Sequence, residues 1–235
     1  MTHAEIIKRY LKNWKDVDIG QTGFPFVTIS RQAGAQGHIL GREIIRQLSE
    51  TRNPHLEFGW ELFDQKLCAL LAQNDGLHTS FESLVEEEYR SGIQQTVYEM
   101  FVGRSEQYEL QKKIAGVIGL LASLGKVVII GRGACCVTRG LPQGIHVRLV
   151  GPERARIQNV MSELEVREED AIQHMRQQDE DRQRMMRDYF NKDINDPLLY
   201  DVVWNVGSVS IPEIAQILVG MINRKLHAKK PAIIS

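Results

Sequence analysis

Hydrophobic residues along this chain gather in short runs, and the segments between the runs carry apolar residues at helical spacing. The runs have the length and composition of β-strands and lie at residues 24–30, 58–63, 126–130, 145–150 and 200–206. Continuous apolar runs of this kind are typical of strands buried on both faces of a parallel sheet. Because strands alternate with helices, the pattern predicts a three-layer α/β sandwich around a five-stranded parallel sheet.

Helical spacing extends over most of the remaining chain, at residues 4–14, 39–48, 67–71, 80–124, 153–161, 167–190 and 211–226. The longest stretch is expected to break near Gly92 and Gly103. Its last piece ends at Gly125, which is typical of a helix C-terminus.

The domain organisation follows from these elements. Residues 1–22 form an expected appended helix with a linker at 20–23, packed on the domain or on a partner. One α/β domain is expected at 23–226 and a C-terminal tail at 227–235.

Composition narrows the class of protein. The formal net charge of −1 gives no overall attraction to nucleic acid or to an anionic membrane. The three cysteines, Cys68, Cys135 and Cys136, form no disulfide framework, as expected in a reducing cytoplasm. No run reaches the length of a membrane span, and no export signal is recognisable at the N-terminus. We therefore expect a cytoplasmic protein without nucleic-acid or membrane partners.

The loop between the first strand and the following helix is rich in glycine. A strand, a glycine loop and a helix in this order form a phosphate cradle, because backbone N–H groups and the helix N-terminus face an anion. The residues that would contact the phosphates of a bound nucleotide are Gly34, Ala35, Gln36, Gly37, His38 and Ile39. An ordinary glycine-rich turn explains the same residues and stays open.

A working P-loop adds a lysine for the phosphates and a Ser or Thr for magnesium. Those places hold His38 and Ile39 if Gly37 is the second motif glycine, or Gly37 and His38 if the motif begins one residue earlier, and residues 16–65 contain no lysine. Arg31 is a candidate replacement, since arginine binds phosphate through two donors, whereas Arg42 suits a solvated helix face. A neutral imidazole of His38 could also donate to phosphate.

Two further residues follow predicted strands, where open parallel sheets bind their ligands. Arg132 lies between two glycines after the strand 126–130 and could bind an anion or pair with a neighbouring helix. Asp64 comes directly after the strand 58–63. It could cap the next helix, take part in holding magnesium or polarise an acceptor, and these roles are compatible.

The helix at 167–190 carries arginines at positions 176, 182, 184 and 187, with acidic residues three or four positions away. Surface ion pairs explain this pattern. As part of a nucleotide site, Arg182, Arg184 and Arg187 would instead neutralise charge during phosphoryl transfer.

Several segments together resemble the cytidylate kinase-like family, a branch of the P-loop nucleoside monophosphate kinases. They run in the family's order from about residue 25 to 225: Phe26–Gln32 with Gly34, Gly37 and Gly41, then Val128–Ala134, Val147–Pro152, Asp179–Arg182 and Asp196–Asn205. The resemblance implies a core parallel sheet, a helical acceptor-binding insert at 64–124 and a lid at 176–195. It also implies ATP and Mg²⁺ as cofactors.

Two departures from the family pattern stand out. The glycine loop lacks the lysine, which bears on the rate of transfer, and Gly133 replaces an aspartate that helps to read the acceptor nucleotide. The resemblance therefore leaves the acceptor open.

Our leading hypothesis is a phosphotransferase that moves a phosphoryl group from ATP to a (d)CMP-like acceptor. The glycine loop would hold the donor, Arg132 the acceptor phosphate, and Arg182, Arg184 and Arg187 would close over the reacting group, with Asp64 near the acceptor. The partners would be nucleoside mono- and triphosphates. The alternatives are a nucleotide- or phosphometabolite-binding regulator that has lost transfer, and an interaction protein or homodimer formed through the helix at 4–14.

Overall fold

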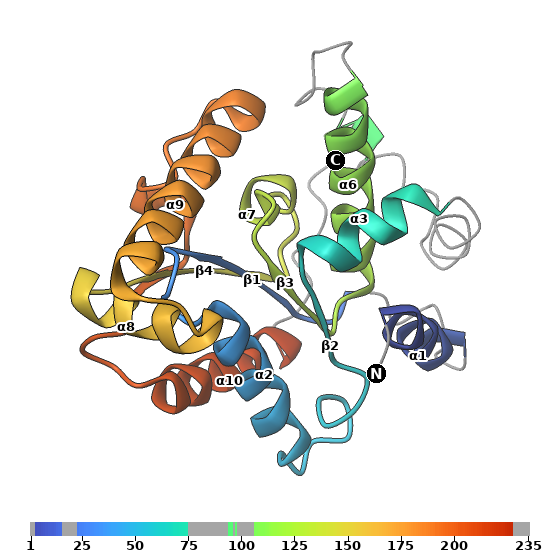
Figure 1. Ribbon diagram of the computed structural model, residues 1–235. Helices are drawn as coiled ribbons and strands as arrows, with labels where there is room; N and C mark the ends of the chain where they lie inside the picture. The colour runs from blue at the N-terminus through green and yellow to red at the C-terminus, as the bar shows by residue number, and fades with distance from the viewer. Residues whose placement is uncertain (1–2, 16–22, 75–93, 96, 98–105, 228–235) are drawn as a thin grey trace.

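The computed structural model describes residues 3–15, 23–74, 94–95, 97 and 106–227. The elements of this part of the chain are, in order, α1 (His3–Lys15), β1 (Phe26–Arg31), α2 (Gly37–Ser49), β2 (Glu61–Phe63), α3 (Gln65–Gln73), α6 (Glu106–Leu124), β3 (Val127–Ile130), α7 (Ala134–Val137), β4 (Gly144–Val150), α8 (Glu153–Leu164), α9 (Glu168–Phe190), the 3-10 turn η2 (Pro197–Leu199), β5 (Val202–Asn205) and α10 (Ile211–His227) (Figure 1).

The strands form one parallel sheet in the order β2-β3-β1-β4-β5, so the five-stranded parallel sheet expected from the sequence is confirmed. β1 is the central strand, and its Thr28 lies opposite Ile129 of β3 and His146 of β4. Because β1 and β3 are neighbours and parallel, the chain leaves both strands at the same edge of the sheet. The glycine loop and Gly131–Gly133 are therefore brought together.

Helices cover both faces of the sheet, as Figure 1 shows. On one face α2 and α10 pack against each other and on inward residues such as Val27 and Ile130. On the other face α3, α6 and α7 pack on residues such as Phe26 and Ile129. Successive strand residues enter opposite cores, which explains why the strands are apolar at nearly every position.

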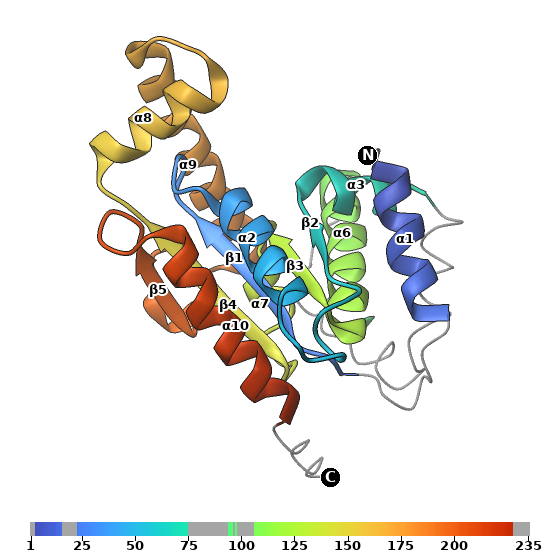
Figure 2. The same cartoon turned by 90° about the horizontal axis from the view of Figure 1, so that it is seen from below.

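Helix α1 packs on its own domain. Ile7 and Tyr10 are fully buried, and the hydroxyl of Tyr10 donates to the carbonyl oxygen of Gly125 at 2.7 Å. The guanidinium of Arg9 forms two hydrogen bonds with the buried carboxylate of Glu61, the first residue of β2. In Figure 2, α1 accordingly lies beside α6 at the β2 side of the sheet.

Element boundaries differ slightly from those expected. The last strand is shorter than 200–206, because Asp196 caps the turn η2 and the hydroxyl of Tyr200 bonds the carbonyl of Ile194 at 2.9 Å. Most of the helical stretch expected at 80–105, with its breaks at Gly92 and Gly103, lies outside the described residues, and so does most of the linker at 20–23. None of the helices in the described ranges is long and apolar enough to span a membrane.

Candidate functional site

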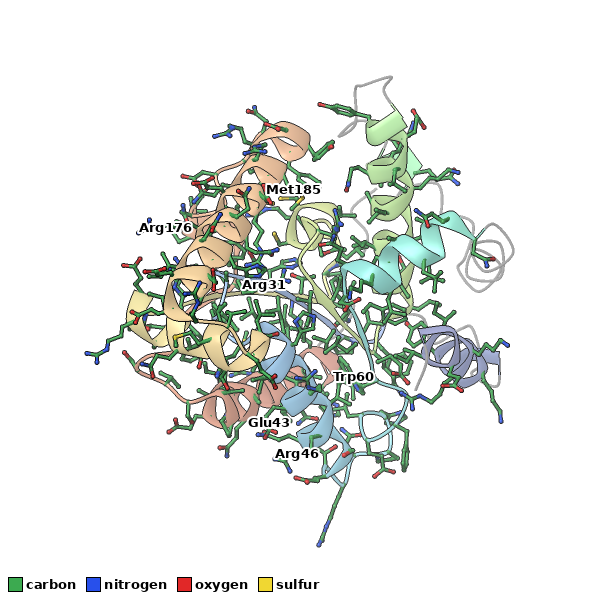
Figure 3. The ribbon with its side chains drawn as sticks, in the orientation of Figure 1. Arg31, Glu43, Arg46, Trp60, Arg176 and Met185 are labelled. Atoms are coloured by element: carbon green, nitrogen blue, oxygen red, sulfur yellow. The ribbon has the colours of Figure 1, made fainter. Side chains whose placement is uncertain are left out.

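A cavity of about 230 Å³ lies at the edge of the sheet where β1 and β3 end. Its walls come from β1, from the turn after β3, from the start of α3 and from α9. Arg31 and Met185, both labelled in Figure 3, line it from the sheet and from α9. Arg132 and Arg182 also line the cavity, so the structure brings three of the predicted site residues, Arg31, Arg132 and Arg182, together.

Arg31 passes between the two glycine motifs. A Cβ atom on Gly37 would lie 3.2 Å from Cγ of Arg31, and one on Gly131 would lie 2.3 Å from its Nη1. Both glycines thus leave room for this side chain. Within the described residues its guanidinium has no hydrogen bond or ion pair. Burial, and then the nearby Arg182, lower the pKa of Arg31 to about 9.

Arg132 occupies an unusual backbone position. It has a φ of 57° and lies between Gly131 and Gly133, which also have positive φ. Its Nε is buried without a partner in the described part of the chain, and burial lowers the pKa of its guanidinium. At Gly133, a Cβ would lie 2.2 Å from Cε2 of Phe190. The ring of Phe190 therefore takes the space that an aspartate side chain would need at position 133.

Arg148 adjoins this cavity through Ser30, and Arg182 lines it. Arg148 of β4 is 4% exposed and donates to Oγ of Ser30 at 2.9 Å and to Oδ1 of Asn195 at 3.1 Å. Arg182 of α9 donates to Oε1 of Gln178 at 3.0 Å, and burial lowers the pKa of Arg182. Guanidinium groups that converge at one place with few carboxylates attract a multiply charged anion.

Asp64 is the N-cap of α3, as expected. Its Oδ1 accepts the backbone N–H groups of Lys66 and Leu67 at 2.9 and 3.0 Å. Its Oδ2 lies 3.6 Å from Nε2 of His38, and this interaction is the main reason why the pKa of Asp64 falls to about 2. Neither Asp64 nor His38 lines the cavity, whereas the neighbouring Gln65 does.

The glycine loop is covered by α8 and α9. The N–H of Ala33 donates to Oδ1 of Asp179 at 2.7 Å, and the carbonyl of Ala33 accepts Nη1 of Arg156 at 3.1 Å. The carbonyl of Gly34 accepts Nδ2 of Asn159 at 2.8 Å. In addition, a Cβ on Gly34 would lie 2.3 Å from the carbonyl oxygen of Arg156. The backbone of the loop is thus hydrogen-bonded to side chains of α8 and α9.

The remaining residues expected to contact donor phosphates surround the start of α2 rather than the cavity. Gln36 is the N-cap of α2 with a φ of 60° and makes no side-chain cap bond, and α2 begins at Gly37. Ala35 is fully buried and Ile39 is exposed. These residues do not line the cavity.

Arg184 and Arg187 are not brought to the cavity either. Their side chains are 58% and 70% exposed and lie 3.8 Å from carboxylate oxygens of Asp181 and Asp188. Surface ion pairs account for both, while Arg182, on the inner face of the same helix, lines the cavity.

Three residues of this region had no site role expected from the sequence: Arg148, Arg156 and Asp179. The position of Arg148 inside the apolar strand 145–150 was an available signal, because a charge there must be paired or must serve a site. Asp179 begins one of the segments that carry the family resemblance, whereas Arg156 lies on a charged helix and carries no comparable signal. In the described ranges, no group of three or more His, Cys, Asp or Glu residues is placed to hold a metal ion.

Comparison with solved structures supports this architecture. The crystal structure of an uncharacterized protein from Eubacterium ventriosum ATCC 27560 superposes with a TM-score of 0.64 and 17% sequence identity, covering 85% of this chain and 98% of that chain. At this identity the likeness shows the fold alone. A search of curated proteins gives no significant match.

The family assignment rests on the sequence of the domain that builds the sheet and the cavity. The model of the cytidylate kinase-like family matches residues 26–208, from the first residue of β1 to just beyond β5. The match includes both glycine motifs, the cavity arginines and α9. This chain belongs to the cytidylate kinase-like family.

Proposed function

We propose that the protein is a nucleotide-dependent phosphotransferase that moves a phosphoryl group from ATP to a (d)CMP-like nucleoside monophosphate. The observation that carries the proposal is Arg31, a guanidinium without a partner among the described residues that passes between the glycine loop and Gly131. A cation at this junction can contact a phosphate on either side of it.

The acceptor phosphate would bind in the cavity, between Arg31 and Arg132. Arg182 would approach it from α9, and the charge that develops on the transferred group would be neutralised by these fixed cations. Catalysis would therefore depend on positioning and electrostatics, without a covalent intermediate on the protein.

Mg²⁺ fits this site only as an ion held largely by water and by the donor phosphates. Asp181 lines the cavity, whereas Asp64 is occupied by its cap bonds and by His38. When bound, the ion would supply positive charge that offsets the charge of the donor phosphates.

A second function is a nucleotide- or phosphometabolite-binding regulator without transfer. Two observations favour this candidate: the glycine loop lacks the usual lysine, and the Ala33 amide is hydrogen-bonded to Asp179.

A homodimer through α1 remains a prediction. It would have to use the outer face of α1, because Ile7 and Tyr10 pack within the chain.

The proposal is tested by a coupled assay with ATP, Mg²⁺ and CMP, dCMP or UMP. We expect turnover with at least one acceptor, and a loss of about 100-fold or more in kcat/KM for Arg31→Ala and for Arg132→Ala. Arg46→Ala is the matched control, since this exposed arginine, labelled in Figure 3, pairs with Glu43 far from the cavity, and it should retain kcat/KM within about twofold.

Two results would contradict the proposal, the first against transfer itself and the second against the role of Arg31. No turnover with any acceptor, together with calorimetric binding of nucleotide that is independent of Mg²⁺, would support the regulator. Normal turnover by Arg31→Ala would remove the residue on which the proposal rests.

A further inference from the structure

Asp179 bonds the glycine loop from a distant part of the chain. Its Oδ1 accepts the N–H of Ala33 at 2.7 Å, and its Oδ2 accepts Nη1 of Arg156, also at 2.7 Å. Nη1 of Arg182 lies 3.5 Å from Oδ1. The carboxylate is 22% exposed. It is thus an anion held by a loop amide and by guanidinium groups.

These are the partners that a phosphate oxygen would use in the same loop. Backbone amides and guanidinium groups bind carboxylates and phosphates by the same charge-assisted hydrogen bonds. An anion of the protein and an anion of a ligand cannot both accept the Ala33 N–H at 2.7 Å. The two must exclude each other.

Helix α8 reinforces this contact. Asn159 bonds the carbonyl of Gly34 at 2.8 Å, and Arg156 bonds both Asp179 and the carbonyl of Ala33. The α8 backbone also lies so near Gly34 that no Cβ would fit there. Since α8 and α9 pack on each other, release of Asp179 would remove the α9 contact and leave α8 bonded to the loop only through Arg156 and Asn159.

We infer that Asp179 is an internal competitor of the donor phosphates, which closes the glycine loop until a nucleoside triphosphate displaces it. The inference rests on the proposed function, because it requires that the loop bind the donor. Of the three arginines that line the acceptor cavity, only Arg182 approaches Asp179, at 3.5 Å, and Arg31 and Arg132 make no contact with it among the described bonds. Release of Asp179 should therefore change donor binding more than acceptor binding.

The expected size of the effect follows from the strength of the contact. A ligand that binds only the open form has an apparent Kd raised by the inverse of the open fraction. One or two charge-assisted hydrogen bonds reduce that fraction about 10-fold to 100-fold. Removal of the carboxylate charge should therefore tighten ATP binding by about 10-fold or more.

The test compares Asp179→Asn with Glu180→Gln, which removes the same charge from the next residue of α9, an exposed side chain. ATP and CMP are titrated separately into each full-length variant by calorimetry. We expect Asp179→Asn to tighten ATP binding about 10-fold and to leave the Kd for CMP within about twofold, whereas Glu180→Gln should change neither. ATP binding that is unchanged or weaker in Asp179→Asn would overturn the inference, and so would equal tightening of ATP and CMP.

A measurement on the wild-type protein covers the case in which Asp179→Asn does not fold. Hydrogen exchange of the α9 segment around Asp179 is followed with and without saturating ATP, in the absence of acceptor. Faster exchange with ATP is expected if the donor displaces the carboxylate, and slower exchange would refute it. Neither readout depends on turnover, so this inference can fail while the proposed transfer stands.

Discussion

The substitution Gly131→Ala tests whether the position of the Arg31 side chain depends on the absence of a Cβ atom at residue 131. The new Cβ would lie 2.3 Å from Nη1 of Arg31, which is far inside van der Waals contact. The clashing atom is the end of a flexible side chain, so the guanidinium would be displaced while the backbone remained in place. Since Gly131 has a φ of 79°, the alanine would also cost about 1 kcal/mol of folding free energy.

The effect on binding should be larger than the effect on stability. Displacing Arg31 removes a charge-assisted contact to phosphate worth about 1.5–3 kcal/mol, which is about a 10-fold to 100-fold loss of CMP affinity. The assay is calorimetric titration with CMP, with urea unfolding of the same samples. Gly116→Ala is the matched control, because nothing lies within 4 Å of a Cβ at this position in α6. It should stabilise the fold by about 0.5–1 kcal/mol and leave binding unchanged.

A double substitution tests whether Gly131 acts through the side chain of Arg31. In a protein that already carries Arg31→Ala, Gly131→Ala should cause no further loss of CMP affinity, because the side chain that it displaces is gone. Additive losses would mean that Gly131 acts through the backbone and not through Arg31. Normal CMP binding by Gly131→Ala alone would contradict the contact itself.

Four further substitutions test other parts of the structure. Arg9→Ala should lower the free energy of unfolding by about 3 kcal/mol, more than Glu61→Gln does, because it leaves a buried carboxylate without its partner; urea titration of both variants checks the order. Asp64→Asn should lower the free energy of unfolding by about 1 kcal/mol at pH 7, after allowance for solvent screening. This loss should vanish as the pH falls from about 4 toward 2, because the pKa of Asp64 in the folded state is lowered to about 2. Unfolding curves of both proteins across this pH range measure the difference. Gly34→Ala should lift α8 from the glycine loop, because its Cβ would meet the backbone oxygen of Arg156; faster proteolysis of α8 and α9 in otherwise folded protein would show it, and unchanged cleavage would contradict it.

The sheet could be predicted from the sequence because its signals are local. Five apolar runs and their alternation with helices mark the strands, and Asp64 precedes an apolar helical pattern as an N-cap does. The contacts that define the site are not local. The Ala33 amide and the Asp179 carboxylate are 146 residues apart, and hydrophobic periodicity says nothing about which face of a charged helix meets a loop. For the same reason Arg182 could not be separated from Arg184 and Arg187 before the packing of α9 was known.

Because of the guanidinium groups around the cavity, the measured stability of the protein should depend on the anions in the buffer. Any small polyanion that binds the folded cavity stabilises the fold by the logarithm of its concentration over its Kd, and at 100 times the Kd this amounts to about 2.7 kcal/mol. Arg31 and Arg132, which lack partners among the described residues, would supply this linkage. Melting temperatures measured in phosphate or citrate should therefore exceed those in an anion-poor buffer, and the difference should be smaller in Arg132→Ala.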